Sequence, residues 1–494
     1  MAQLAIRSYK TFILYVVSGL FLLLNCLLIA HEVYWFLLFP IAMLIIWLAI
    51  FHLDLLLLLT AFLVPLSVNL KDISFGVGMN MPTEPIMFGV LVLFTIRLFA
   101  DRGLPRELLR HPVSVAILIN LFWLFITTLT SQMPVVSAKF LISRLWFVVG
   151  FFFFGVRIFR DMRYARSFMW LYIFSLIFVI LFALGQHVQF NFDEQSAHWV
   201  MHPFYNDHTA YGAALAMYFP FIVSACFDKT IPPDRKLLVI FVGVLFTVAI
   251  ILSYTRATWV SLVGVFGLYL LFRAGVKLKH LAMVGVAALI LFFTYQDEIF
   301  LKLEGNRQDS STQLSEHVQS ISNISTDASN LERINRWKSA FRMFREKPFV
   351  GWGPGTYAFQ YAPYQRSAEL TIISTNAGDM GNAHSEYIGP MVESGVFGLI
   401  SFLLVIITIC HTFSKIMVKG RHTREVRHMA IVIFLGLTTY LIHGFLNNFL
   451  DTDKASVPFW GFAAILVALD IYGKRKNAGG LNEPAAEKSH IIQK

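Results

Sequence analysis

The side chains best suited to chemistry gather in one stretch, residues 381–395, where a polar segment gives way to a long apolar run. His384 lies there beside Glu386 and Tyr387, and Glu393 follows. Histidine is the side chain best able to take up a proton near neutral pH, and a carboxylate could orient its ring. The stretch predicts that His384 is a general base, with a purely structural histidine as the alternative.

Arginine side chains upstream of this histidine could bind an anion. Arg256 lies in a very short connection between the apolar segments 237–254 and 257–272, and Arg333 and Arg336 lie in a basic segment. A guanidinium group matches phosphate oxygens with a planar fork of donors, so these residues predict a phosphate site. The alternative is that they extend to lipid headgroups, as long cationic side chains near a bilayer do.

The basic segment has the sequence of an amphipathic helix. Ser329 and Glu332 form a capping-box pattern and Pro348 ends the helical pattern, which predicts a helix over about residues 330–346. A basic amphipathic helix of this kind is expected to lie on a membrane surface. Its apolar side is formed by Leu331, Ile334, Trp337, Phe341 and Phe344.

The histidine stretch is itself expected to contain a short helix. Pro390 follows Gly389 and cannot continue a helix from before it without a kink. We therefore predict a short helix around 384–388, a break, and a membrane span that begins near Pro390.

Two other motifs are better explained by structure than by chemistry. His198 and His202 are four residues apart and would share one face of a helix, but no cysteine or intervening glutamate completes a zinc motif. We expect a polar cap there rather than a metal site. The glycines of 351–355 lack the strand and helix that flank a phosphate-binding loop, so we predict tight turns.

The elements that position these residues are membrane spans. The chain has 494 residues, of which 57% are hydrophobic and 14% charged, whereas a soluble domain carries about 25% charged residues. Apolar runs long enough to cross a bilayer recur, which predicts an all-α polytopic protein with about 12–14 transmembrane helices. The apolar segments are 12–30, 34–50, 53–66, 83–100, 113–130, 138–156, 167–186, 209–227, 237–254, 257–272, 280–295, 386–413, 429–446 and 457–473.

Four parts of the chain follow from this pattern. We predict an N-terminal transmembrane bundle, a large periplasmic loop, C-terminal transmembrane helices and a disordered cytoplasmic tail, which correspond to residues 1–295, 296–385, 386–473 and 474–494. Cys26, Cys226 and Cys410 all fall in apolar runs, so neither a disulfide nor a cysteine metal site is expected.

Loop charges predict the orientation. The net charge of +10 comes from cations that cluster in alternate connections, which explains the charge without a nucleic-acid partner. Because cationic loops stay in the cytoplasm, both termini are predicted to be cytoplasmic, and 187–208 and 296–385 to be outside. The short connections on that side hold only Lys71, Arg256 and Lys454.

Three pieces of the sequence together resemble the O-antigen ligase and O-antigen polymerase family of bacterial envelope glycan transferases. The resemblance covers about residues 200–470, and one departure from the family pattern is Ser385, where many members have asparagine. The pieces are 253–256, then 333–340 running into 348–355, and finally 383–387 followed by 392–398.

The resemblance implies an activity and a set of partners. It implies transfer of a glycan from undecaprenyl pyrophosphate to a hydroxyl of lipid A core or of a growing polysaccharide, without a metal or other cofactor. The reaction would take place at the periplasmic face of the inner membrane, among membrane lipids. Arg256 and Arg333 would bind the pyrophosphate and His384 would activate the acceptor. Further substrate contacts are expected from Arg336, Glu386, Tyr387 and Tyr254.

Two other functions are compatible with the sequence. A solute transporter, for example of bicarbonate, would place polar groups inside the bundle, as Lys139 and Arg144 of a predicted span are placed. A non-catalytic assembly factor for glycan export would have the same topology without needing His384 as a base.

Overall fold

The computed structural model divides the chain into two compact units, Met1–Leu59 and Thr60–Lys494. Each unit is described by itself. The structure describes residues 2–70, 79–100, 104–276, 280, 295, 328–371, 374, 381–418 and 420–473. The predicted span 280–295, most of the first part of the predicted periplasmic loop and the predicted tail therefore lie outside the described residues.

The first unit consists of helices. α1 (Ala2–Ala30) is followed by the short η1 (Trp35–Leu38) and by α2 (Phe39–Phe51). The ring of Phe36 lies 5.5 Å from that of Phe21 and 5.2 Å from that of Phe39, centroid to centroid, so aromatic contacts hold the turn. α3 (Leu53–Leu63) begins in this unit and continues into the second.

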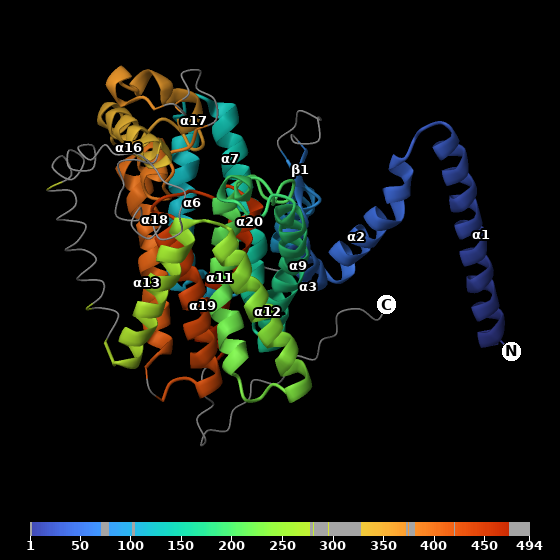
Figure 1. The fold of residues 1–494 in the computed structure, drawn as a ribbon. Helices are drawn as coiled ribbons and strands as arrows, with labels where there is room; N and C mark the ends of the chain where they lie inside the picture. The colour runs from blue at the N-terminus through green and yellow to red at the C-terminus, as the bar shows by residue number, and fades with distance from the viewer. Residues whose placement is uncertain are drawn as a thin grey trace. The chain divides into compact units, whose positions relative to one another are not determined.

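The second unit is a helical bundle (Figure 1). In the part of the chain that the structure describes, nine helices are long and apolar enough to cross a membrane, which confirms the predicted all-α polytopic fold. Every predicted apolar segment within the described residues coincides with helices over most of its length, and the exceptions lie at segment ends such as 386–387 and 444–446. The elements of the bundle are η2 (Val64–Leu66), α4 (Thr83–Ala100), α5 (Arg106–Leu109), α6 (Pro112–Leu129), α7 (Pro134–Phe147), η4 (Val148–Phe154), α8 (Gly155–Ile158), α9 (Met162–Val188), α10 (Glu194–Ala197), α11 (His208–Phe227), α12 (Pro233–Leu252), α13 (Arg256–Arg273), α18 (Ile388–Ile416), α19 (Arg424–His443) and α20 (Asp453–Tyr472).

The remaining elements are short or lie outside the bundle. β1 (Val68–Asn69) and β2 (Asn80–Met81) pair antiparallel, with Val68 opposite Met81. At one end of the bundle, α16 and α17 lie across the ends of the long helices (Figure 1). The elements there are α16 (Ala328–Glu346), α17 (Tyr357–Gln360), η5 (Ala362–Tyr364) and η6 (Ser367–Glu369).

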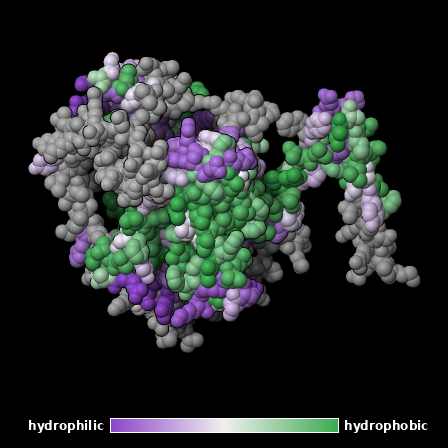
Figure 2. All heavy atoms as spheres, in the orientation of Figure 1, coloured by the Kyte–Doolittle hydropathy of each residue, from purple (hydrophilic) through white to green (hydrophobic). Residues whose placement is uncertain are grey.

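The two ends of this bundle differ in charge. Short links alternate the direction of successive helices, so α11, α13, α18 and α20 begin at the end that carries α16, which we call the α16 end. The face seen in Figure 2 is an apolar band with hydrophilic residues gathered beyond it at both ends. We call the end opposite α16 the basic end, because it carries Arg157, Arg160, Arg163, Arg166, Lys236, Arg273, Lys415, Arg421 and Arg424.

α20 is the central helix of the bundle. Of its apolar window, 89% is buried, and helices α11, α18, α19 and η4 pack around it. Tyr172 of α9 stacks on Tyr218 of α11 at 4.3 Å, and Tyr218 meets Phe462 of α20 edge to face at 5.2 Å. A helix buried on all sides fits its sequence, which is apolar over most of its length, and it gives the bundle a rigid core.

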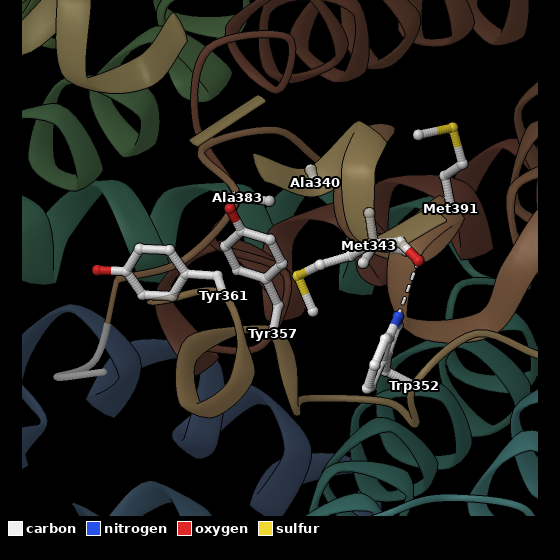
Figure 3. Packing of buried hydrophobic residues seen from close by; sticks show 8 residues of the cluster. Ala340, Met343, Trp352, Tyr357, Tyr361, Ala383 and Met391 are labelled. Atoms are coloured by element: carbon white, nitrogen blue, oxygen red, sulfur yellow. Dashed lines mark hydrogen bonds between the residues drawn. The ribbon is translucent and has the colours of Figure 1, made fainter. Parts of the chain in front are cut away.

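The apolar side of α16 packs against protein rather than against a membrane, contrary to the prediction from its sequence. Ala340 and Met343 are fully buried against Trp352, Tyr357 and the 383–392 segment (Figure 3). The indole nitrogen of Trp352 donates to the carbonyl of Met343 over 3.0 Å. The helix itself was predicted within two residues of its observed bounds, but periodicity alone could not identify what covers its apolar side.

The helix break after the histidine also lies elsewhere than predicted. Residues 381–387 are not helical, and α18 begins at Ile388 and includes Pro390. Proline fits the first turn of a helix because the N–H that it lacks would have no partner there. The break occurs at Gly395 (φ 70°), where an added Cβ would lie 2.0 Å from the carbonyl oxygen of Phe349.

His198 and His202 lie in turns outside α10, so their four-residue spacing does not place them on one helix face. α10 is one short turn that ends at Ala197. Asp193 caps its start, and His198 is its C-cap residue. The ring of His198 lies instead 4.0 Å from that of His208. Gly351, Gly353 and Gly355 all have positive φ values, which confirms the tight turns predicted for 351–355.

Candidate functional site

His384 lies on a loop that α16 holds in place. Its backbone is in the left-handed region (φ 47°), and its N–H donates to Oδ1 of Asn382 over 3.1 Å. Arg336 Nη1 donates to the carbonyl of Asn382 (3.2 Å), and Trp337 Nε1 donates to that of Ala383 (3.1 Å). A left-handed non-glycine residue is uncommon, so these bonds to the two preceding residues stabilise an unusual backbone at the position of the predicted base.

The contacts of the Arg336 guanidinium group are all made within the protein, and one of them is to this loop. Its Nε donates to Glu332 Oε1 at 2.8 Å, and its guanidinium lies 5.2 Å from the centre of the Tyr361 ring. An added Cβ on Gly381 would lie 1.8 Å from Nη1, so only glycine leaves room for the arginine here. Burial raises the pKa of Glu332, but hydrogen bonds from Ser374, Arg336 and Thr371 lower it by more. The pKa of Glu332 therefore lies below its ordinary value, and the carboxylate stays charged.

The next two residues of the loop hold it to the link after α19. Glu386 accepts hydrogen bonds at Oε1 from the backbone N–H groups of Phe449 (2.7 Å) and Leu450 (2.9 Å) and from the Tyr440 hydroxyl. Tyr387 donates to the carbonyl of Leu441 over 2.9 Å. Burial raises the pKa of Glu386 above its ordinary value. The hydrogen bonds of both side chains are therefore made within the protein.

Arg256 is the first residue of α13, directly after the link from α12. In this link Tyr254 has a positive φ of 47°, and its hydroxyl donates to the carbonyl of Phe192 over 2.9 Å. Thr255 Oγ1 donates to the carbonyl of His208 over 2.9 Å. The link therefore joins the start of α13 to the start of α11.

Electrostatic interactions bring the predicted site residues together. The charges of Arg256 and Arg333 both act on the His208 ring, so the two arginines share one neighbour. Arg333 also acts on His384 and on His443, the last residue of α19. Segments far apart in the sequence thus meet around Arg333 at the α16 end, and we call this group the arginine–histidine cluster: Arg256, Arg333, His208, His384, His443 and Asp207.

The cluster keeps His384 neutral. Burial, together with the positive charges of Arg333 and Arg336, lowers the pKa of His384 from 6.5 to about 3, and Asp207 and Glu332 only partly oppose this. At neutral pH the imidazole has a free lone pair, so it can accept a proton or a hydrogen bond.

Asp207, His208 and His443 were not among the predicted site residues. Asp207 caps α11, accepting at Oδ1 from the N–H groups of Thr209 (2.7 Å) and Ala210 (2.8 Å). Each of the three lies at the end of an apolar segment on the same side of the membrane as Arg256, and this position is the one signal in the sequence that could have identified them.

The geometry offers no metal site in the described part of the chain, where no three His, Cys, Asp or Glu side chains are placed to hold an ion. The chemistry of the cluster is that of cationic side chains beside imidazoles, of which that of His384 is neutral. Such a set can bind a multiply charged anion and accept a proton next to it.

A comparison with family models gave a match that covers part of this cluster. Residues 241–403 match the O-antigen ligase family, and this range includes Arg256, Arg333 and His384. A comparison with curated proteins gave no match. The enzyme family that matches transfers glycans in general. The similarity to the O-antigen ligase family is thus shown for residues 241–403, about a third of the chain.

Proposed function

We propose that this protein transfers a glycan from undecaprenyl pyrophosphate to an acceptor hydroxyl, either of lipid A core or of a growing polysaccharide. The observation that carries the proposal is that Arg333 of α16 acts on both His384 and His208, and that Arg256 of α13 acts on the same His208. The match to the O-antigen ligase family over 241–403 supports the reaction class.

The arginines would bind and stabilise the leaving group. In the proposed step the acceptor oxygen attacks the anomeric carbon of the sugar, and the bond from that carbon to the phosphate oxygen breaks. The electron pair of this bond stays on the released prenyl pyrophosphate. Preorganised cations stabilise such developing charge, and the loss of one typically costs about 100- to 1000-fold in rate.

His384 would take the proton of the acceptor hydroxyl. Its neutral ring can do so at pH 7, and a bound diphosphate would offset the charges of Arg333 and Arg336 that lower its pKa. Donor binding would thus make His384 a stronger base at the moment when the acceptor reacts. Arg336, Glu386 and Tyr387, whose bonds hold the loop, would position His384 rather than bind substrate.

The site would face the periplasm of a bacterium with the chain in its inner membrane. Cations gather at the basic end, opposite the arginine–histidine cluster, and positively charged loops stay in the cytoplasm. Both termini would then be cytoplasmic, and the lipid-anchored donor would meet the site at the outer interface. We retain the four parts 1–295, 296–385, 386–473 and 474–494 as the domain organisation of this proposal.

The cations that motivated the transporter alternative lie beside carboxylates. The charge of Arg144 acts on Glu386 and Glu393, and that of Lys139 acts on Glu84. These interactions support a role in holding α7 to its neighbours, so we do not propose transport.

Reconstitution tests the proposal. Purified protein in proteoliposomes would be given an undecaprenyl-pyrophosphate-linked oligosaccharide with candidate acceptors, and products would be read by mass. The expected result is an acceptor heavier by one glycan together with free undecaprenyl pyrophosphate. Uptake of labelled bicarbonate without glycan transfer to any acceptor would contradict the proposal and favour the transporter.

A further inference from the structure

His443 has a buried hydrogen-bond donor that the fold does not use. The residue ends α19 and is only 1% exposed, and Asn447 Nδ2 lies 3.1 Å from its Nε2. An amide NH₂ group only donates, so Nε2 must be the acceptor and the proton of the neutral ring is on Nδ1. Nδ1 is buried and has no hydrogen-bond partner among the residues that the structure describes.

The surroundings of this donor favour an anion. The charges of Asp207, Arg333 and His208 act on the His443 ring, so the ring that carries this buried donor belongs to the arginine–histidine cluster. A buried donor without an acceptor costs free energy, and an oxygen atom supplied by a ligand would remove that cost. Beside Arg333, the oxygen that fits both groups is that of a phosphate.

A purely structural role for His443 explains the contact at Nε2 but not the buried Nδ1–H. The bond from Asn447 ties the end of α19 to the following link, and the Phe449 ring lies 6.0 Å away. Both features concern how the ring is held. Neither supplies an acceptor for Nδ1–H.

We propose that His443 is a substrate-binding residue that donates its Nδ1–H to a phosphate oxygen of a prenyl diphosphate held by Arg333. The inference rests on the proposed function and adds a specific contact to it. Two histidines of the cluster then have opposite roles, since His384 presents a lone pair to the acceptor hydroxyl and His443 presents a proton to the leaving group. Asn447 is the positioning residue, because its amide fixes which nitrogen of His443 is protonated.

Two amide substitutions separate the two nitrogens. The amide of asparagine reaches the position of Nδ1, and that of glutamine reaches the position of Nε2. Binding of farnesyl pyrophosphate to the purified full-length protein in detergent would be titrated for the wild type, His443→Gln and His443→Asn. We expect about 10- to 100-fold weaker binding for Gln, because it keeps the contact to Asn447 and loses the donor, and near-normal binding for Asn.

Two results of this titration would overturn the inference. Normal binding by the Gln variant, or equal weakening in both variants when both unfold at the wild-type temperature, would show that Nδ1–H does not contact the diphosphate. Failure of the wild type to bind farnesyl pyrophosphate would instead count against the proposed function itself.

A parallel titration with short-chain phosphatidylglycerol distinguishes the source of the phosphate. We expect the wild type and the Gln variant to bind this phospholipid alike. Loss of phospholipid binding in the Gln variant, with farnesyl pyrophosphate binding retained, would assign the donor to a lipid headgroup and overturn the inference.

Discussion

Both ends of the bundle bury charged and imidazole groups, but in opposite arrangements. At the basic end, Asp470 of α20 gathers Lys415, His111 (3.3 Å), Arg421 (3.8 Å) and His422 (3.9 Å) around one carboxylate. At the α16 end, Arg333 acts on His208, His384 and His443. Asp207, a carboxylate that acts on all three, is used to cap α11.

The difference separates a structural cluster from a reactive one. A buried carboxylate with cationic partners is balanced, and such a group holds helices together without needing a ligand. The arginine–histidine cluster presents cationic and donor groups whose balance improves when an anion binds. If this comparison is right, substitutions at the α16 end should affect the reaction and substitutions at the basic end should affect stability.

The largest effect is expected at His384. His384→Ala should lower glycan transfer at least about 100-fold while the protein still folds and inserts, because the general base is lost. His384→Gln should be similarly impaired, since glutamine keeps hydrogen bonding but cannot take the proton. Transfer rates in proteoliposomes would be compared with elution of the purified variants on gel filtration. Near-normal transfer by the Gln variant would mean that His384 only positions substrate.

A somewhat smaller loss is expected from conservative changes of the arginines. Arg256→Lys and Arg333→Lys should each lower transfer about 10- to 100-fold, because lysine keeps the charge but not the bidentate fork. Arg345→Lys, an exposed position on α16, is the matched control and should have no effect. Equal rates for all three variants would remove the proposed anion clamp.

At the basic end the effect should be on stability alone. Asp470→Asn should lower the free energy of unfolding by about 1.5–3 kcal/mol, because charged hydrogen bonds to a buried carboxylate are lost. Partial exposure of Lys415 and Arg421 keeps the loss below that of a fully buried pair. Thermal unfolding in detergent measures this effect, and transfer per folded molecule should not change.

The matched control for that experiment is Asp161→Asn. Asp161 pairs with Arg163 over 2.7 Å, but the side chains are 37% and 87% exposed. An exposed pair contributes little, so no measurable change in unfolding is expected. A large effect of Asp161→Asn, or a loss of transfer in Asp470→Asn, would break the distinction between the two ends.

The smallest effect is a pH dependence of stability. The pKa of His384 is about 3 in the folded protein and 6.5 ordinarily, so between these values the unfolded chain binds more protons. Stability should therefore fall as the pH drops below about 6.5, by less than about 1.4 kcal/mol per pH unit from this residue. As the pH is lowered from 8 to 5, the unfolding temperature should fall more steeply for the wild type than for His384→Gln. Parallel curves would mean that burial and the arginines do not lower the pKa of His384 in the folded protein.

The sequence was a good guide to elements and a poorer one to their neighbours. Hydrophobic runs and caps predict the spans and α16 because these signals are local. Arg333 and Arg336 are equivalent in such a pattern, yet Arg336 is bound to Glu332 and the 382 carbonyl while Arg333 acts on the histidines. Which side of a helix faces a loop 46 residues further on is a tertiary fact.

The same limit explains the missing members of the site. His384 and Arg256 were predicted from their types and places, whereas His443 is an ordinary residue at the end of a span until the start of α11 and the end of α19 are brought together. The helix break was predicted at Pro390 but occurs at Gly395. Without knowing where the helix begins, one cannot tell whether a proline lies in its first turn or in its interior.

A structure of the protein with bound farnesyl pyrophosphate, determined by cryo-electron microscopy, tests the central claim most directly. The account predicts diphosphate density within hydrogen-bond distance of both Arg256 and Arg333, with His384 beside it at the position of an acceptor hydroxyl. Density for the diphosphate at the basic end, or on one arginine with the other turned away, would contradict the claim that α11, α13, α16 and the 381–387 loop form one anion-binding site.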